Sequence, residues 1–184
     1  MSNKVKYNIR EFHYAPMTSS GYGTPVALPG TVSISLEPQG ENTPFYADGI
    51  EYYTTSSNFG YEGELENALV DDAFRMALLG EVKDSNNNLV ELADAEAKKF
   101  AFGFVIDGNA GPIYFWFYNA IASRPAITSS TKEESIEVQT DTITISTKPD
   151  ENGYVRIKST DTSTTSSWFT AVVTPDMSDD DDNG

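Results

Sequence analysis

The chain has 184 residues, enough for one domain of ordinary size. It contains no cysteine and a single histidine, His13, which excludes disulfides, thiolate metal sites and metal sites built on pairs of histidines. Its 28 acidic and 12 basic residues give a net charge of −16, which disfavours binding to nucleic acid or to an anionic membrane surface.

Residues 1–30 are predicted to form an N-terminal arm. Three prolines and three glycines interrupt this segment, and Val5, Tyr7 and Ile9 alternate with polar residues in one short amphipathic strand. Its early lysines are not followed by an apolar stretch, so we expect no secretory signal and a chain made in the cytoplasm. The aromatic side chains of the arm need a surface to bury against, on their own domain or on a neighbouring chain.

Residues 31–175 are predicted to form the main domain. Val32, Ile34 and Leu36 alternate with polar residues, which is typical of a half-buried strand. Farther along, Asp48-Gly49 stands between aromatic and β-branched runs and predicts a tight β-hairpin.

One helix is expected, over residues 64–79. Leu65, Leu69 and Ala73 recur at helical spacing, and Gly80 follows the last apolar residue. Three acidic residues would then lie at the positive N-terminal end of the helix: Glu62, Glu64 and Glu66.

The most apolar pair of strands is predicted over residues 100–107 and 112–122. In both strands the two alternating faces carry apolar or aromatic side chains, so both faces of the pair need cover. The core can cover one face, whereas the other needs the helix, the N-terminal arm or another subunit. We therefore expect one chain to have more apolar β surface than it can bury, and further copies of the chain to cover the rest.

The last third of the chain adds more strands. Ile136 and Val138 occupy even positions, whereas Ile143 and Ile145 occupy odd ones, which predicts a bulge near residues 140–142. Strands over 154–158 and 168–173 follow, and residues 176–184, with five acids and no base, are predicted to be a disordered acidic tail. Nine or ten strands and one helix predict a mainly β fold, a β-sandwich or partly closed barrel with a flanking helix.

No pattern in the sequence favours an enzyme. The sequence contains no nucleophile elbow that could act with His13. The helix dipole explains why three glutamates stand at the start of the predicted helix. The run Asp179–Asp182 is not a preorganised cation cage, because it stands on a flexible tail. We expect no catalytic residue, no metal site and no cofactor.

Surface aromatics leave one small-ligand alternative open. Such rings can stack on sugars, which would make the chain a carbohydrate-binding or adhesin-like β-sandwich module. The same residue types are enriched in protein–protein interfaces, and we favour that interpretation. The side chains concerned are Tyr52, Tyr53, Tyr61, Trp116 and Trp168.

Several motifs follow one another over residues 20–175. A Pro/Gly-rich arm with Tyr22-Gly23-Thr24-Pro25 precedes Tyr46-Ala47-Asp48-Gly49, and the run Tyr61-Glu62-Gly63-Glu64-Leu65-Glu66 follows. The strand Phe100-Ala101-Phe102-Gly103-Phe104 comes next, and then Ser123-Arg124-Pro125 before a Thr-rich strand. In this order the motifs resemble the major tail (tail tube) proteins of long-tailed, non-contractile bacteriophages that infect Gram-positive bacteria.

The resemblance implies a structural virion protein that is not an enzyme. Such proteins are β-sandwiches or barrels with a flanking helix, and they assemble into hexameric rings that stack into a tube through which DNA is ejected. The implied partners are further copies of the chain, the tape-measure protein, the tail-terminator and tail-tip proteins, and DNA in transient, non-specific passage, but no membrane. The implied location is the virion tail, assembled in the cytoplasm of the host bacterium.

Two sets of residues are candidates for this role. A wall that repels phosphate keeps DNA moving, so acidic side chains on strands with polar alternation are candidates for the lumen: Glu37, Glu51, Glu137 and Asp141. The long connections near residues 40–42, 56–60, 123–134 and 159–167 are candidates for ring-to-ring contacts. Subunit contacts are expected from apolar and aromatic side chains: Tyr22, Tyr61, Leu65, Phe102, Tyr114, Trp116, Tyr118 and Trp168.

Overall fold

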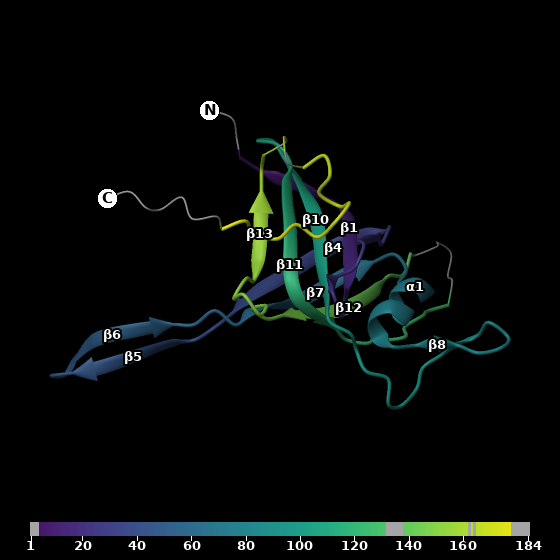
Figure 1. Cartoon of the computed structure of the whole chain (residues 1–184), viewed down its shortest axis with the longest axis horizontal. Helices are drawn as coiled ribbons and strands as arrows, with labels where there is room; N and C mark the ends of the chain where they lie inside the picture. Colours follow the sequence, from purple (N-terminus) through teal and green to yellow (C-terminus); the bar gives the residue numbers. More distant parts are fainter. Residues whose placement is uncertain (1–3, 132–137, 162, 164, 178–184) are drawn as a thin grey trace.

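A computed structural model describes residues 4–131, 138–161, 163 and 165–177 of the protein. Within them, the chain forms thirteen strands, one short α-helix and one π-helical turn (Figure 1). Nine strands make the main antiparallel sheet: β1 (Lys6–Thr18), β2 (Gly21–Tyr22), β3 (Val26–Ala27), β4 (Thr31–Gln39), β7 (Gly60–Asn67), β10 (Phe100–Gly108), β11 (Ile113–Ala122), β12 (Asp141–Thr147) and β13 (Arg156–Ser159).

The main sheet is curled. Its strands follow the order β2-β1-β10-β11-β12-β7-β4, with β13 beside β11 and β3 beside β1. β1 and β4 are distant in this order but contact each other. The Leu28 amide, directly after β3, donates to the Phe12 carbonyl at 2.9 Å and so extends the pairing of β3 with β1. The predicted mainly β fold with a flanking helix is confirmed.

Most of the segment expected as an N-terminal arm belongs to the sheet. β1 pairs with β10 along its length, and a register shift between Arg10 and His13 accommodates Glu11, whose φ of 56° is left-handed. Phe12 and Tyr14 are buried in the core of their own domain, whereas Tyr7, near the start of the strand, is 69 % exposed.

The helix is shorter than predicted. β7 runs through Asn67, and helix α1 (Asp72–Phe74) begins only after Asp71, whose side chain accepts a hydrogen bond from the Phe74 amide at 2.8 Å. The π-helical turn η1 (Arg75–Leu79) continues it and ends at Gly80, with φ of 76°. The first half of the predicted helix over 64–79 is therefore wrong, because Leu65 belongs to an alternation of period two that continues strand β7.

One face of the β10–β11 pair lies over the main core. Phe102 stacks on Phe117 with ring centroids 5.0 Å apart, and Phe12 from β1 and Phe74 from α1 pack around them. Every described residue of this core cluster comes from the same chain, so this face is covered as expected.

The other face of the β10–β11 pair is covered by residues 165–173, which we call the C-terminal strap. The Trp116 indole N–H donates to the Trp168 carbonyl at 3.1 Å, and the Tyr118 hydroxyl donates to the Val173 carbonyl at 2.6 Å. Trp116 and Tyr118 are 0 % exposed. The strap consists of turns instead of the strand expected over 168–173. The sequence left the helix, the N-terminal arm or another subunit as the cover of this face; instead, the strap of the same chain covers it.

The predicted bulge near residues 140–142 does not form. β12 begins at Asp141, so the even-numbered phase of the apolar pattern lies before the strand instead of inside it. Val138 is 82 % exposed, and Ile136 lies outside the described residues.

Two small hairpins lie outside the main sheet. β5 (Asn42–Ala47) and β6 (Ile50–Ser56) form a ribbon that extends away from the body, at the left of Figure 1. Its turn has φ of 53° at Asp48 and 78° at Gly49, which confirms the predicted hairpin. β8 (Val82–Lys83) and β9 (Leu89–Val90) form the second hairpin, at the opposite end of the molecule.

Candidate functional site

The β5–β6 hairpin has an apolar face that none of the described residues of its own chain covers. The register pairs Phe45 with Tyr53 and Ala47 with Ile50, so these four side chains project from the same face of the ribbon. We call them the hairpin face. The opposite face is more polar and includes the pairs Tyr46–Glu51 and Pro44–Thr54.

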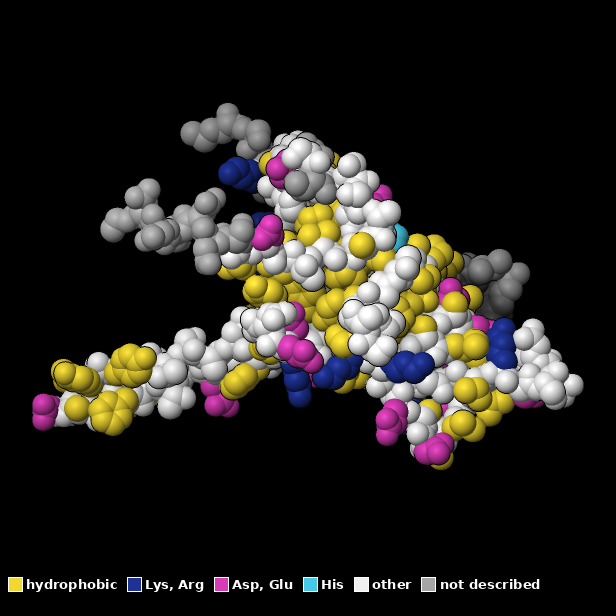
Figure 2. Space-filling model, in the orientation of Figure 1, with side chains coloured by type: hydrophobic (Ala, Val, Ile, Leu, Met, Phe, Trp, Pro, Cys, Tyr) yellow, Lys and Arg dark blue, Asp and Glu magenta, His cyan; other side chains and the backbone are white. Residues whose placement is uncertain are grey.

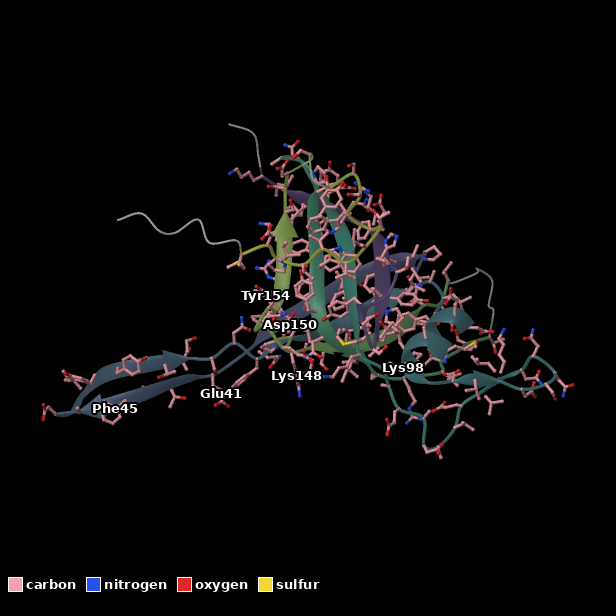
Figure 3. The ribbon with its side chains drawn as sticks, in the orientation of Figure 1. Glu41, Phe45, Lys98, Lys148, Asp150 and Tyr154 are labelled. Carbon is pink, nitrogen blue, oxygen red and sulfur yellow. The ribbon has the colours of Figure 1, made fainter. Side chains whose placement is uncertain are left out.

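The hairpin face is open to solvent. Phe45, Ile50 and Tyr53 are 59, 64 and 63 % exposed, and Figure 3 shows Phe45 far out on the hairpin, away from the body of the molecule. An isolated two-stranded hairpin is only marginally stable in water, and clustered exposed aromatics are typical of protein contacts. The hairpin face is therefore suited to binding another protein surface.

A second surface is strongly acidic. β4, β7 and β12 lie side by side, and their core-facing side chains include Ile34, Leu65 and Ile143. On the other side of the same strands, the register aligns only hydroxyls and carboxylates in three rows: Ser33, Glu66 and Thr142; Ser35, Glu64 and Thr144; Glu37, Glu62 and Ser146. We call this surface the acidic face, and a shallow groove of about 420 Å³ lies over it.

Among the described residues, no lysine or arginine forms an ion pair with the four glutamates of the acidic face. The sequence explains this, because residues 11–74 contain ten acids and neither lysine nor arginine. Like charges on one side of a sheet raise a negative potential that repels phosphate and attracts counterions.

Hydrogen bonds fix one carboxylate of the acidic face. The Thr140 hydroxyl donates to Glu66 Oε1 at 2.6 Å, and the Ser33 hydroxyl donates to Glu66 Oε2 at 3.0 Å. These two bonds favour the ionised form and lower the pKa of Glu66 below its ordinary value, Thr140 having the larger effect. The ladder of hydroxyls therefore holds Glu66 as a charged side chain.

Five of the predicted subunit contacts are core residues of a single chain. The sequence pattern identified them as apolar β surface but could not show that one chain covers both sides of the sheet. In this conformation they offer no surface to a neighbour. They are Leu65, Phe102, Trp116, Tyr118 and Trp168, which are at most 2 % exposed.

Three further predicted contacts are half-buried. The Tyr22 hydroxyl accepts a hydrogen bond from the Asn119 amide at 3.0 Å. Tyr61 packs edge-on against Phe117, and Tyr114 packs against Trp168 in the same manner. These contacts lie within one chain and leave only part of each ring available to a partner.

The predicted lumen residues are not gathered in one place. Glu37 lies on the acidic face, whereas Glu51 lies on the β5–β6 hairpin. Asp141 shares the core-facing side of β12 with Ile143, and its carboxylate accepts a hydrogen bond from the Val70 amide at 2.8 Å. Glu137 lies outside the described residues.

Neither the hairpin face nor the acidic face could be recognised as a single surface from the sequence. Glu62, Glu64 and Glu66 were expected at a helix start, but their strict alternation with Gly63 and Leu65 was the signal for a strand with one acidic side. The aromatic residues of the hairpin were visible in the sequence, yet only the register shows that Phe45 and Tyr53 share a face.

Two of the aromatic residues on which the carbohydrate-binding alternative depends are not accessible to a ligand. Trp116 and Trp168 are buried beneath the strap and cannot stack on a sugar, whereas Tyr52 and Tyr53 are 72 and 63 % exposed on the hairpin. Tyr61 is half-buried, and the Arg156 guanidinium lies 6.0 Å from its ring centroid.

The described part of the chain offers neither a metal site nor a membrane-spanning helix. There, no three or more acidic, cysteine or histidine side chains gather in a way that could hold a metal ion. His13 stacks on Phe169 of the strap, with ring centroids 4.1 Å apart. No helix formed by the described residues has the length and apolarity needed to cross a membrane.

The solved structures that match this chain include two of low similarity. No family model matches the sequence, and no curated protein does. A chain from the sheath–tube complex of an extracellular contractile injection system (PVC), in its extended state, matches with a TM-score of 0.46 and 15 % identity, over 85 % of this chain and 95 % of that one. A chain from the 6-fold symmetrised baseplate of the anti-feeding prophage (AFP) matches with a TM-score of 0.47 and 9 % identity, over 86 % of this chain and 97 % of that one. At this level of similarity, neither match supports an argument about function.

Proposed function

We propose that the chain is the protomer of a phage tail tube, a structural protein that polymerises with copies of itself. The motif order over residues 20–175 supports this function, as does the need of the β5–β6 hairpin for a partner. The single observation that carries the proposal is the exposed hairpin face, in which Phe45 and Tyr53 lie opposite each other at 59 and 63 % exposure.

In the proposed assembly, hexameric rings stack into a hollow tube, and the hairpin of each copy contacts a neighbouring copy. An aromatic ribbon that protrudes from a folded body gains stability only when a second surface covers it. A symmetric polymer provides such a surface to every copy. The hairpin includes or adjoins two connections already predicted for ring-to-ring contacts, those near residues 40–42 and 56–60.

The acidic face is proposed to line the channel. Its rows of glutamates and hydroxyls remain hydrated, and its negative potential prevents phosphate from adhering as DNA passes. This assignment keeps Glu37 as a lumen residue and adds Glu62, Glu64 and Glu66. The other partners in this role are the tape-measure protein and the tail-terminator and tail-tip proteins of a long-tailed, non-contractile phage.

Electron microscopy of the purified protein tests this function. The protein is concentrated at several ionic strengths and imaged by negative stain, beside the double variant Phe45→Ser/Tyr53→Ser. The wild type is expected to form rings or tubes and the variant to stay monomeric with an unchanged circular dichroism spectrum. A wild-type protein that remains a monomer at every concentration and salt condition would contradict the proposal.

A further inference from the structure

Strand β13 forms an open edge of the main sheet. It pairs with β11, and none of the other described strands pairs with its outer side. Its side chains alternate: Ile157 packs against the cluster beneath the strap, whereas Arg156 and Lys158 project to the opposite side of the sheet. There they stand across from Phe117 and Phe115, and both are exposed. We call Arg156 and Lys158 the basic edge.

The basic edge carries positive charge that no ion pair neutralises within the described part of the chain. Neither Arg156 nor Lys158 belongs to any of the ion pairs found there. Arg156 contacts aromatic rings instead: its guanidinium lies 6.0 Å from the ring centroid of Tyr61 and 5.9 Å from that of Phe115. In a chain with a net charge of −16, this edge is a local point of attraction for an acidic segment.

The acids that lie close to β13 in the sequence have other contacts or lie on the other side of the sheet. The Asp161 carboxylate accepts hydrogen bonds from the Ser163 amide and hydroxyl at 2.9 and 2.7 Å. Asp150 and Glu151 line the groove beside β2 together with Tyr22, which packs against the cluster beneath the strap. Figure 2 shows both signs of charge on the body near the root of the β5–β6 hairpin, and Figure 3 places Asp150 there. Like charges therefore disfavour an acidic segment on the strap side, and the basic edge attracts it to the opposite side.

The strap leads the chain past this edge. Val172 and Val173 pack in the same cluster as Ile157, and in Figure 1 the chain passes β13 as it leaves the strap. The run Asp179–Asp182 begins six residues after Val173, and six extended residues span about 20 Å. Neighbouring strands are only about 5 Å apart. The acidic run is therefore close enough in sequence to reach around β13.

We propose that the run Asp179–Asp182 docks on the basic edge of its own chain. The contact gives a role to an acidic segment that the tail-tube function leaves unassigned, and it concerns the single chain whether or not the chain assembles. An exposed ion pair contributes little by itself, but a short tether gives the run a high effective concentration at the edge. Salt weakens such a contact. A docked tail excludes other acidic partners from the basic edge.

Paramagnetic relaxation enhancement measured by nuclear magnetic resonance tests this contact. The chain has no cysteine, so a spin label can be attached at Asn183→Cys alone. In the dilute monomer, the label is expected to weaken the amide signals of residues 156–159 at least twofold more than those of the β8–β9 turn at residues 84–88. High salt should remove the difference.

Charge variants separate docking from mere proximity to the strap. Arg156→Gln/Lys158→Gln should abolish the excess weakening at β13. Lys98→Gln/Lys99→Gln is the matched control, because these two lysines are likewise absent from the ion pairs of the described residues, and it should leave the excess unchanged. If the double variant at the basic edge fails to fold, as judged by circular dichroism, Lys158→Glu alone decides and should give the same loss.

The outcomes distinguish this inference from the proposed function. An excess that persists in Arg156→Gln/Lys158→Gln, or that the lysine control removes equally, would overturn docking on the basic edge. An effect seen only between a spin-labelled copy and a separate isotope-labelled copy would assign the tail to a second copy and overturn docking within the chain. A protein that never forms tubes but shows the predicted effect would contradict the tail-tube function and leave this inference standing.

Discussion

The indole N–H of Trp116 donates to the backbone carbonyl of Trp168 at 3.1 Å, and this bond joins the central strand β11 to the C-terminal strap. The Trp168 indole in turn donates to the Phe115 carbonyl at 3.3 Å, so the two segments are tied in both directions. The apolar surface that the sequence offers to a neighbour is therefore covered from within, and the surface that needs a partner is the β5–β6 hairpin.

Replacing Trp168 by alanine is expected to destabilise the monomer strongly. The substitution removes a side chain that is 2 % exposed and uncovers Trp116, and truncations of this kind cost about 3–5 kcal/mol. Urea unfolding followed by fluorescence measures the change. Phe45→Ala is the matched control, with an expected loss of less than about 0.5 kcal/mol because Phe45 is 59 % exposed. Equal losses in the two variants would contradict the role of the strap.

The pKa of Glu66 is expected to rise when Thr140 loses its hydroxyl. Nuclear magnetic resonance titration of the side chain compares the wild type with Thr140→Val, and the variant should move toward the ordinary value of 4.5. Thr144→Val, on the same side of the sheet but opposite Glu64, is the control and should leave Glu66 unchanged. An identical Glu66 titration in all three proteins would show that the hydrogen bonds have no effect on this carboxylate.

The hydrogen bonds to Glu66 also make the free energy of unfolding fall as the pH is lowered. The pKa of Glu66 is lower in the folded protein than in the unfolded chain, so its contribution is present above the ordinary value of 4.5 and is lost as pH falls through the folded pKa. Thermal unfolding at pH values below 4.5 should therefore show a shallower loss of stability for Thr140→Val than for the wild type. A steeper loss for the variant would reverse the sign and contradict this account.

Reversing charge on the acidic face is expected to make the assembled tube bind DNA. Glu62 and Glu64 lie on the strand at the centre of this face, so Glu62→Lys/Glu64→Lys replaces repulsion of phosphate by attraction. Co-sedimentation of DNA with tubes at fixed salt should rise several-fold over the wild type. Glu41→Lys, between β4 and the hairpin, is the control, and equal DNA binding by both variants would contradict a channel lined by the acidic face.

The strands of this fold can be predicted from the sequence better than the surfaces that the folded protein exposes. The strand around Ile34 and Leu36 and the Asp48-Gly49 turn depend on local chemistry, and the structure has both where expected. Val32 departs from the expected alternation, because the register shifts between Thr31 and Ser33 and leaves its side chain 49 % exposed. The pattern around Leu65 predicts a helix and a strand equally well, because one apolar residue among glutamates fits both periods.

What the sequence could not show depends on contacts between distant segments. Trp116 pairs with a strap 52 residues later in the chain, and no local pattern indicates that this strap covers the second face of β11. For the same reason, the sequence could not show that five of the predicted subunit contacts are buried within one chain, and the hairpin face became visible only with its register.

Hydrogen exchange of the β5–β6 hairpin before and after assembly tests the central claim most directly. If the hairpin face binds a neighbouring copy, the amides of residues 42–56 should exchange quickly in the monomer and at least tenfold more slowly in the tube. The β8–β9 turn at residues 84–88, which is outside the proposed contact, is the internal control and should change little. Hairpin amides that exchange as quickly in tubes as in monomers would contradict the account.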